Sequence, residues 1–488
     1  MGVVAKQSIL NTFITYFGFA FGAANTLFLF TNILGEEEYG VVSYLLASSN
    51  LLWPLLAFGL PNTLIKFYNT YTNKMESDRF FSWLLLVPLV LVSVVSIVFT
   101  LFYEQLMEQY THTNPIVKPY LWIVIVLGCA SAYFELFYAW AKVHLQTVKG
   151  NLIKELFHRV AITVLLILVY FKLITAHQFI YSLTAVFLAR TLLMKWIAFG
   201  IKRPKFSLGK LKNENELVVY STLILISATV SVFLLDLDKV MIENLAPPIS
   251  NVAKYSICVY MASVIGVPVR AMLQITNPLT AQLLVKKETK ALNELNKKSS
   301  VTALIATVWV GLVVVCNVHS IFELVPPNYQ LYIEVVFLIG IVKLFDASLG
   351  ITNAILFNSN SYKWILFFGV AILGLAYVFN SIFIPSEGIV GAAFATFLAY
   401  SLYNIAKLLF VLFTYKIQPF SKQTFLIIGF ATSIWFVFYY WYIPNINAIA
   451  SILIKGSLIT VFYFVIIYLL KLSPEVNKAI DRVVFRRI

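Results

Sequence analysis

Nine basic residues lie within stretches of sequence that are otherwise apolar: Lys66, Arg159, Arg190, Lys239, Lys254, Arg270, Lys343, Lys407 and Lys455. Six acidic residues share these stretches: Glu135, Glu155, Asp236, Asp238, Glu243 and Asp346. A charged side chain within the lipid core costs about 3 kcal/mol or more unless it faces protein or water. Because the positive charges outnumber the negative ones, the set suits an anionic cargo, and Arg in particular grips phosphate oxygens with two donors at once.

Membrane-spanning helices must position these charges. The chain has 488 residues, is 60% hydrophobic and only 12% charged, as is typical of a multi-pass membrane protein. Its long unbroken apolar runs predict helices, because the strands of a membrane barrel alternate apolar and polar residues and are about half as long. Each run is near the roughly 20 residues that cross a bilayer as a helix. We predict about fourteen spans, at 8–34, 40–68, 80–103, 119–141, 152–171, 177–199, 217–245, 252–284, 300–324, 332–357, 363–384, 388–413, 424–442 and 448–470.

The distribution of Lys and Arg predicts the orientation of these spans. The formal net charge is +14. With a cytoplasmic N-terminus and an even number of spans, the basic residues fall mainly in cytoplasmic segments, as the positive-inside rule requires. The largest basic loops are Lys195–Lys212 and Lys286–Lys298, a third group is Arg482, Arg486 and Arg487, and the longest outer loop is Glu104–Lys118. We therefore predict that both termini are cytoplasmic, and that the positive charge sets topology rather than binding nucleic acid.

Two similar hairpins indicate an internal repeat. Asn32–Tyr44 and Asn244–Ser256 each lead from an apolar helix through a short polar turn to a small residue, Gly40 or Ala253, that opens the next helix. Repeats of this kind place the substrate site between the two halves of a transporter. The expected fold is all-α, with two pseudo-symmetric six-helix lobes and two C-terminal helices. The expected parts are an N-terminal lobe at 1–200, a basic cytoplasmic linker at 201–216, a C-terminal lobe at 217–415, and two helices with a basic tail at 416–488.

Three segments carry a family resemblance. Leu34–Gly40, Asp238–Leu245 and Ala253–Ser256 resemble the repeat motifs of bacterial polysaccharide exporters, the O-antigen and capsule flippases of lipid-linked oligosaccharides. Their superfamily also holds lipid II flippases and multidrug extruders. The resemblance implies a transporter, not an enzyme, that flips an undecaprenyl-diphosphate-linked oligosaccharide across the bacterial inner membrane by alternating access. It implies membrane lipids as further partners and leaves contact with polysaccharide assembly proteins open.

Four basic residues are candidates for lining the substrate cavity. Arg270 lies mid-span between Pro268 and Pro278, and the resemblance to lipid II flippases implies that it meets the diphosphate. The alternative for Arg270 is an ion pair with a buried Asp of another helix. The other three candidates are Arg190, Arg159 and Lys66. Glu155 precedes Arg159 by one helical turn and can pair with it, and Lys66 can instead reach the lipid headgroups.

A second group of charges is expected to form an ion network that gates the transporter: Asp236, Asp238, Lys239, Lys343 and Asp346. Lys239 is spaced to pair with Asp236 or with Glu243 on one helix face. The Asp-x-Asp spacing can also hold a metal in glycosyltransferases, but here it lies in an apolar helix, so no metal is predicted.

Three further charges are isolated in their spans: Glu135, Lys407 and Lys455. Glu135 is either a proton or cation coupling site or the partner of a buried base. Lys407 and Lys455 have no partner at helical spacing, and Lys455 is expected to face lipid or another subunit. A nucleotide-binding loop is not found, and no cofactor is predicted.

Three rival classes fit the sequence less well. A structural or scaffold membrane protein would not need so many charges within its spans. A multidrug extruder of the same superfamily would be expected to have an acidic cavity for cationic drugs, whereas the charges here are mainly basic. A membrane glycosyltransferase or polymerase would be expected to carry a large outer loop, whereas the predicted outer loops are short.

Overall fold

The computed structural model describes the backbone of residues 3–71, 73–144, 146–211, 213–329, 331–359 and 361–484. Every regular element within these ranges is helical, and none is a strand. Among these residues, nine helices are long and apolar enough to cross a membrane, or up to ten if one bent pair forms a single span. The all-α membrane fold is therefore confirmed, whereas the number fourteen stays a prediction.

The chain divides by its internal contacts into two compact units, 1–254 and 255–488. The first unit contains α1 (Val3–Ala23), η1 (Ala24–Leu29), α2 (Phe30–Ile33), α3 (Glu36–Ala57), α4 (Leu60–Phe67), η2 (Tyr68–Thr70), α5 (Lys74–Leu101), α6 (Tyr103–His112), η3 (Pro115–Tyr120), α7 (Leu121–Val143), α8 (Thr147–Leu152), η4 (Ile153–Phe157), α9 (His158–Tyr170), α10 (Ala176–Ile201) and α11 (Glu214–Leu245).

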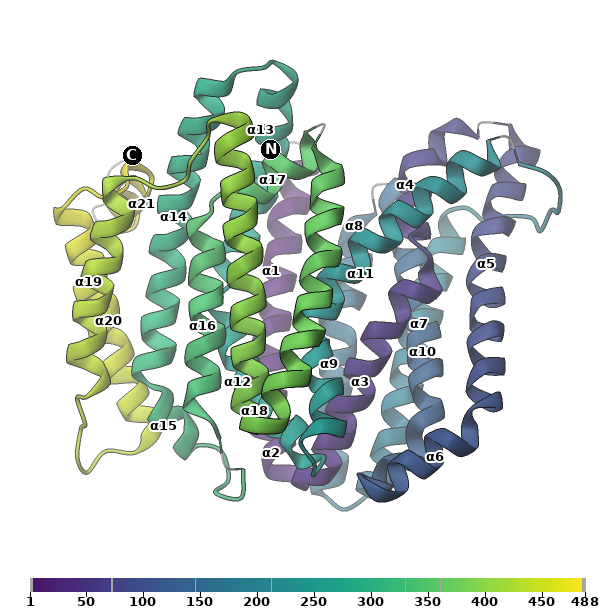
Figure 1. Ribbon diagram of the computed structural model, residues 1–488, viewed down its shortest axis with the longest axis horizontal. Coiled ribbons are helices and arrows are strands. Elements are labelled where there is room, and N and C mark those ends of the chain that lie inside the picture. The colour runs from purple at the N-terminus through teal and green to yellow at the C-terminus, as the bar shows by residue number, and fades with distance from the viewer. Residues whose placement is uncertain are drawn as a thin grey trace. The chain divides into compact units, whose positions relative to one another are not determined.

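The second unit begins within α12 (Ser250–Val264). It continues with α13 (Val267–Val285), α14 (Thr289–Cys316), α15 (Val318–Glu323), α16 (Ile333–Ser348), α17 (Thr352–Asn358), α18 (Tyr362–Tyr415), α19 (Lys422–Tyr439), α20 (Ala448–Leu469) and α21 (Pro474–Val484). Figure 1 labels these elements along the chain.

Helices α3 and α7 form the centre of the first unit. Helix α3 packs against both α7 and α11, and α7 also packs against α10, α4 and α5. The core between these helices is rich in aromatic rings, with Phe81 against Trp140 and both almost fully buried. Contacts thus join α11 to the first unit, although the repeat assigns it to the lobe at 217–415. That division into moving lobes stays a prediction.

A sharp bend interrupts one span of the second unit. Helices α16 and α17 meet at an angle of 61°, and Gly350 at the bend has φ +58°, which is a conformation that favours glycine. A broken helix leaves backbone groups unpaired, and lipid cannot satisfy them. Helix α14 satisfies them here: Asn296 accepts a hydrogen bond from the Ile351 N–H at 2.9 Å, and the Ser300 hydroxyl donates to the Ser348 carbonyl at 2.6 Å.

Two segments predicted as loops are helical. Residues 289–298 of the basic loop Lys286–Lys298 form the start of α14, and most of Glu104–Lys118 forms α6 and η3. Both segments bury a large side chain: Leu292 is 2% exposed, and Tyr110 is 8% exposed. The many charged residues of these segments obscure the helical spacing of their apolar residues in the sequence.

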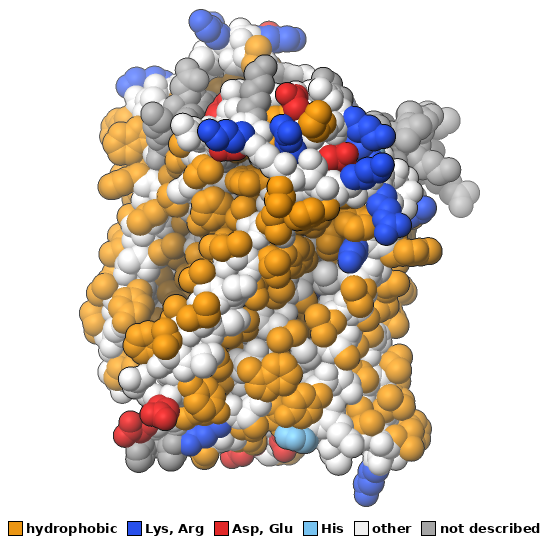
Figure 2. Space-filling model, turned by 90° about the vertical axis from the view of Figure 1, so that its right-hand side faces the viewer, with side chains coloured by type: hydrophobic (Ala, Val, Ile, Leu, Met, Phe, Trp, Pro, Cys, Tyr) orange, Lys and Arg blue, Asp and Glu red, His pale blue; other side chains and the backbone are white. Residues whose placement is uncertain are grey.

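The outer surface of the chain is apolar. Figure 2 shows one face on which hydrophobic side chains form a broad band, and Lys and Arg gather at one of its ends. Exposed apolar side chains of helix α5 include Leu89, Val94, Ile97 and Leu101. Apolar surface of this extent is unstable in water and is expected where lipid surrounds the helices. The protein is therefore a multi-pass membrane protein.

Candidate functional site

The first unit contains two π-helical turns, η1 after helix α1 and η4 before helix α9; η4 packs against α1, and η1 packs against α9. Turns of this type are rare and occur often at functional sites. The buried side chain of Asn25 joins η1 to the first turns of α9, because its Nδ2 donates to the Arg159 carbonyl at 2.8 Å while its Oδ1 accepts from Thr163 at 2.7 Å. Gly18 permits close packing here, since a Cβ at this position would lie 2.7 Å from the Glu155 carbonyl oxygen.

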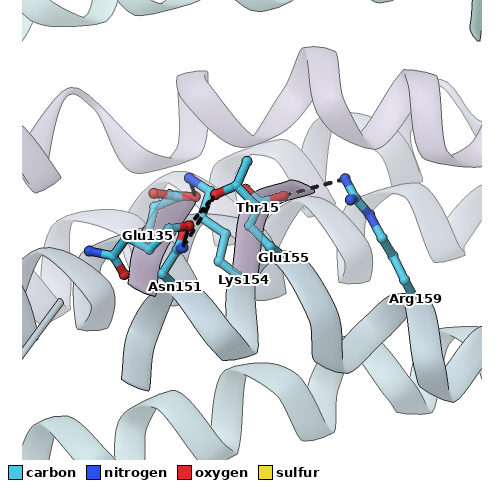
Figure 3. A network of polar contacts seen from close by, with 7 residues as sticks. Thr15, Glu135, Asn151, Lys154, Glu155 and Arg159 are labelled. Carbon is cyan, nitrogen blue, oxygen red and sulfur yellow. Dashed lines mark hydrogen bonds and ion pairs between the residues drawn. The ribbon is translucent and has the colours of Figure 1, made fainter. Parts of the chain in front are cut away.

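A cluster of charged side chains lies along η4, and we call it the basic cluster. It consists of Lys142, Lys154, Arg159 and Arg190 with two acids, Glu135 and Glu155. Lys154 Nζ lies 2.6 Å from Glu135 Oε1, and Arg159 Nη2 lies 3.4 Å from Glu155 Oε2. Figure 3 shows these two pairs side by side, with Asn151 bonded to Thr15 of α1 beside them. Four positive and two negative charges leave the cluster with an excess of two positive charges.

Arg190 is the most buried base of the cluster, with 9% of its surface exposed. Its guanidinium lies 3.8 Å from the centre of the Phe134 ring, and Glu135 and Glu155 are close enough to act on its charge. Arg190 Nε and Arg159 Nη1 are buried donors without a hydrogen-bond partner among the described residues. An unsatisfied buried donor costs about 1–3 kcal/mol, so an anion that accepted a hydrogen bond from either donor would be stabilised.

Lys66 lies elsewhere in the first unit, at the end of α4, and is exposed. Its ammonium sits 3.9 Å from the centre of the Tyr220 ring. This is a cation–π contact, which holds the Lys66 side chain without neutralising its charge.

A second basic group lies in the second unit. Arg270 on α13 is exposed and close enough to Lys343 on α16 to act on its charge. Lys407 on α18 is only 1% exposed; its Nζ donates to Asn353 at 2.8 Å and lies 4.0 Å from Asp346. Lys407 has no partner at helical spacing, as expected, but it is not a lone charge, because its partners lie on other helices.

One of the two ion pairs expected for Lys239 on α11 is present. Lys239 Nζ lies 2.7 Å from Asp236 Oδ1, and Asn50 of α3 donates to the second oxygen of Asp236 at 2.9 Å. Glu243 instead accepts a bond from Asn114 at 2.8 Å. Asp238 is buried, with 3% exposed. In the part of the chain that the structure describes, no group of three or more His, Cys, Asp or Glu side chains could hold a metal ion.

Sequence reasoning missed two bases of the cluster and misplaced Lys455. Lys142 and Lys154 lie near span ends, where a lysine is ordinarily attributed to topology; the signal that could have found Lys154 is its place in the charged run Lys154–Arg159. Lys455 was expected to face lipid or another subunit, but it is 6% exposed. It shares one face of α20 with Ser451, Ile459 and Tyr463, and the Tyr463 hydroxyl donates to the Ile305 carbonyl of α14.

The chain matches a family model described as "Polysaccharide biosynthesis protein" over residues 4–284, which is more than half of its length. A search of curated proteins finds no match.

Solved structures with the same fold are transporters. A lipid II flippase MurJ in an inward closed conformation has a TM-score of 0.74 at 15% identity, covering 94% of this chain and 99% of that chain. An inward-facing multidrug resistance MATE family transporter of the MOP superfamily has a TM-score of 0.62 at 13% identity, covering 84% and 98%. A MOP superfamily transporter from Pyrococcus furiosus Vc1 has a TM-score of 0.56 at 12% identity, covering 85% and 95%. At these identities the likeness shows the fold alone. The chain therefore belongs to the polysaccharide biosynthesis protein family, and it has the fold of the MOP superfamily transporters.

Proposed function

We propose that this protein flips an undecaprenyl-diphosphate-linked oligosaccharide from the cytoplasmic to the outer leaflet of a bacterial inner membrane, with both termini in the cytoplasm. The observation that carries the proposal is the basic cluster. It lies inside a membrane transporter fold, has an excess of two positive charges, and contains buried Arg donors without partners.

The diphosphate would be held chiefly by Arg190 and Arg159, with Lys154 and Lys142 beside them. Guanidinium groups suit this task because they stay charged and offer paired donors to the oxygens of one phosphate. Arg270 would make a further contact with the substrate. The oligosaccharide would follow the diphosphate through the protein, while the lipid tail would stay in the bilayer.

Glu135 would act as the internal counter-ion of the empty site. Its carboxylate lies 2.6 Å from Lys154 Nζ, so a phosphate that bound Lys154 would displace the carboxylate. A carboxylate that loses its cation in a membrane interior is costly, and uptake of a proton would relieve that cost. Substrate binding would thereby be coupled to protonation of Glu135.

The remaining expected roles are proposals for the same cycle. Asp236, Asp238 and Lys239 on α11, and Lys343 and Asp346 on α16, would form ion networks that rearrange as the transporter opens and closes. Lys66 would meet the charged head of the substrate or the lipid headgroups at the cytoplasmic side.

Multidrug extrusion is the second candidate, since several structures of the same fold are multidrug transporters. A cationic drug would be repelled by the excess positive charge of the basic cluster. The charge balance therefore favours an anionic cargo.

Surface polysaccharide in Arg190→Ala cells tests the proposal. We expect export to be lost while the protein remains in the membrane at normal abundance. Lys195→Ala is the matched control, because Lys195 lies on the same helix, five residues later, and is exposed; it should leave export intact. Normal export in Arg190→Ala cells at normal abundance would contradict the proposed diphosphate site. Loss of drug resistance with unchanged surface polysaccharide would favour the second candidate.

A further inference from the structure

We infer that a loop residue, Asn114, is the central part of a latch that closes the outer end of the first unit and must release for that end to open. We call this the outer latch and define it as Glu36, Asn114, Glu243, Ile249 and Lys254. The inference rests on the proposed alternating access. It adds a gating residue outside the ion networks that the sequence indicates.

Asn114 joins two elements with one side chain. It lies between α6 and η3 and is 3% exposed. Its Nδ2 donates to both the carbonyl oxygen and Oε1 of Glu243, each at 2.8 Å, and its Oδ1 accepts from the Ile249 N–H at 2.8 Å. Both hydrogens of the amide are used. They bind the last turn of α11, whose carbonyls lack partners within the helix.

An ion pair closes the latch on the other side. Lys254 Nζ lies 3.1 Å from Glu36 Oε2, and both side chains are mostly buried. Glu36 opens α3, where the helix dipole favours a carboxylate. Close to this pair, Gly40 lets the two backbones meet, because a Cβ there would lie 2.3 Å from the Ile249 carbonyl oxygen.

The latch brings together the two hairpins of the sequence repeat. Glu36 and Gly40 belong to Asn32–Tyr44, and Ile249 and Lys254 belong to Asn244–Ser256. Figure 1 shows α6 and the turn between α2 and α3 at the end of the first unit opposite to the start of α1. Under the proposed topology this end faces outward. Equivalent hairpins therefore press against each other at the outer surface.

The polar contacts along α11 suit an interface that separates. Asp236 and Glu243 are seven residues apart and so lie on one face of the helix. Asp236 binds Asn50 of α3, and Glu243 binds Asn114. Polar groups can exchange such partners for water when the helix moves away, whereas an apolar seam would resist wetting. The latch is thus a set of replaceable bonds at the point where two repeats meet.

Thiol labelling tests the latch without any substrate. In a protein lacking Cys129, Cys258 and Cys316, a cysteine is placed at Ser43, which is 8% exposed and lies one turn below Gly40 on α3. A membrane-impermeant maleimide is applied to the outside of intact cells. The parent should label slowly, and Asn114→Ala and Glu36→Lys should each label about tenfold faster.

Exchanging the charges of Glu36 and Lys254 supplies the decisive experiment. Glu36→Lys combined with Lys254→Glu restores an ion pair of reversed sense, so labelling should fall back toward the parental rate. Glu37→Lys is the matched control, because Glu37 lies in the same first turn of α3 but is exposed; it should leave labelling unchanged. Glu37→Cys should label in every background and so confirms which side is probed.

Two results would overturn the latch. The first is parental labelling in both Asn114→Ala and Glu36→Lys at normal protein abundance. The second is a charge-exchanged double variant that labels as fast as Glu36→Lys. If Asn114→Ala does not fold, the charge-exchange pair alone decides. Surface polysaccharide is measured in parallel: normal export with unchanged labelling would refute only the latch, whereas faster labelling in a chain with no role in export would refute only the proposed function.

Discussion

Replacing Gly18 by Ala should disturb both the stability of the first unit and the basic cluster. A Cβ at position 18 would lie 2.7 Å from the Glu155 carbonyl oxygen and 2.9 Å from Arg159 Nη1. An ordinary van der Waals contact begins near 3.4 Å, so helix α1 must move away from η4 by about 0.7 Å or more. The carbonyl belongs to the backbone of the π-helical turn and cannot swing aside as a flexible side chain would.

The magnitude follows from overpacking in other proteins, where one added carbon in a packed core costs about 1–3 kcal/mol. A loss of 1 kcal/mol lowers the Tm of a 150–250-residue domain by about 2–4 °C. Gly18→Ala should therefore unfold several degrees below the parent in detergent. The Arg159 side chain would be displaced as well, so export should fall even in cells grown below the unfolding temperature of the variant.

Gly200→Ala is the control for the intrinsic effect of alanine. Nothing lies within 4 Å of a Cβ built at Gly200 in the last turn of α10, and alanine has a higher helix propensity than glycine. This variant should be as stable as the parent or slightly more stable. Equal thermal midpoints for Gly18→Ala and Gly200→Ala would refute the close packing of α1 on η4.

Three further expectations concern topology, the second unit and coupling. Reporter fusions at Glu37 should read outside and fusions at Lys205 should read inside; a cytoplasmic signal at Glu37 would contradict the orientation derived from the basic loops. Arg270→Ala should abolish export without lowering protein abundance, because an exposed side chain contributes little to stability, and Arg270→Lys should also be impaired, since an ammonium cannot bind two phosphate oxygens as a guanidinium does; unimpaired export in both would withdraw Arg270 from the site. Glu135→Gln should slow export while Glu135→Asp retains it, and equal rates for the two would remove the proposed coupling role.

Contacts within one helix were predictable from sequence. Helical geometry brings side chains three or four residues apart onto one face, and the expected pairs Asp236–Lys239 and Glu155–Arg159 are both present. The apolar runs likewise predicted an all-α membrane fold, because length and hydropathy alone decide whether a helix can cross the bilayer.

Contacts between helices were not predictable in the same way. Asn114 and Glu243 are 129 residues apart, and Lys407 and Asn353 are 54 residues apart, so no periodicity links them. The π-helical turns at η1 and η4 have no composition that separates them from an ordinary helix. The basic cluster depends on these turns and on Glu135 of a third helix. Its individual charges could therefore be listed from the sequence, but their grouping required the packing of α1, α7, α9 and α10.

The bend between α16 and α17 has a consequence for how the chain enters the membrane. The bend leaves backbone groups without partners in their own helices, and these groups form hydrogen bonds with Asn296 and Ser300 of α14. Helix α14 precedes both helices in the sequence. During synthesis, α14 is therefore already present when the bent span leaves the insertion machinery. A partner that followed later would leave the Ile351 N–H and the Ser348 carbonyl facing lipid in the meantime. The order of helices along the chain thus protects the most irregular span from the bilayer during assembly.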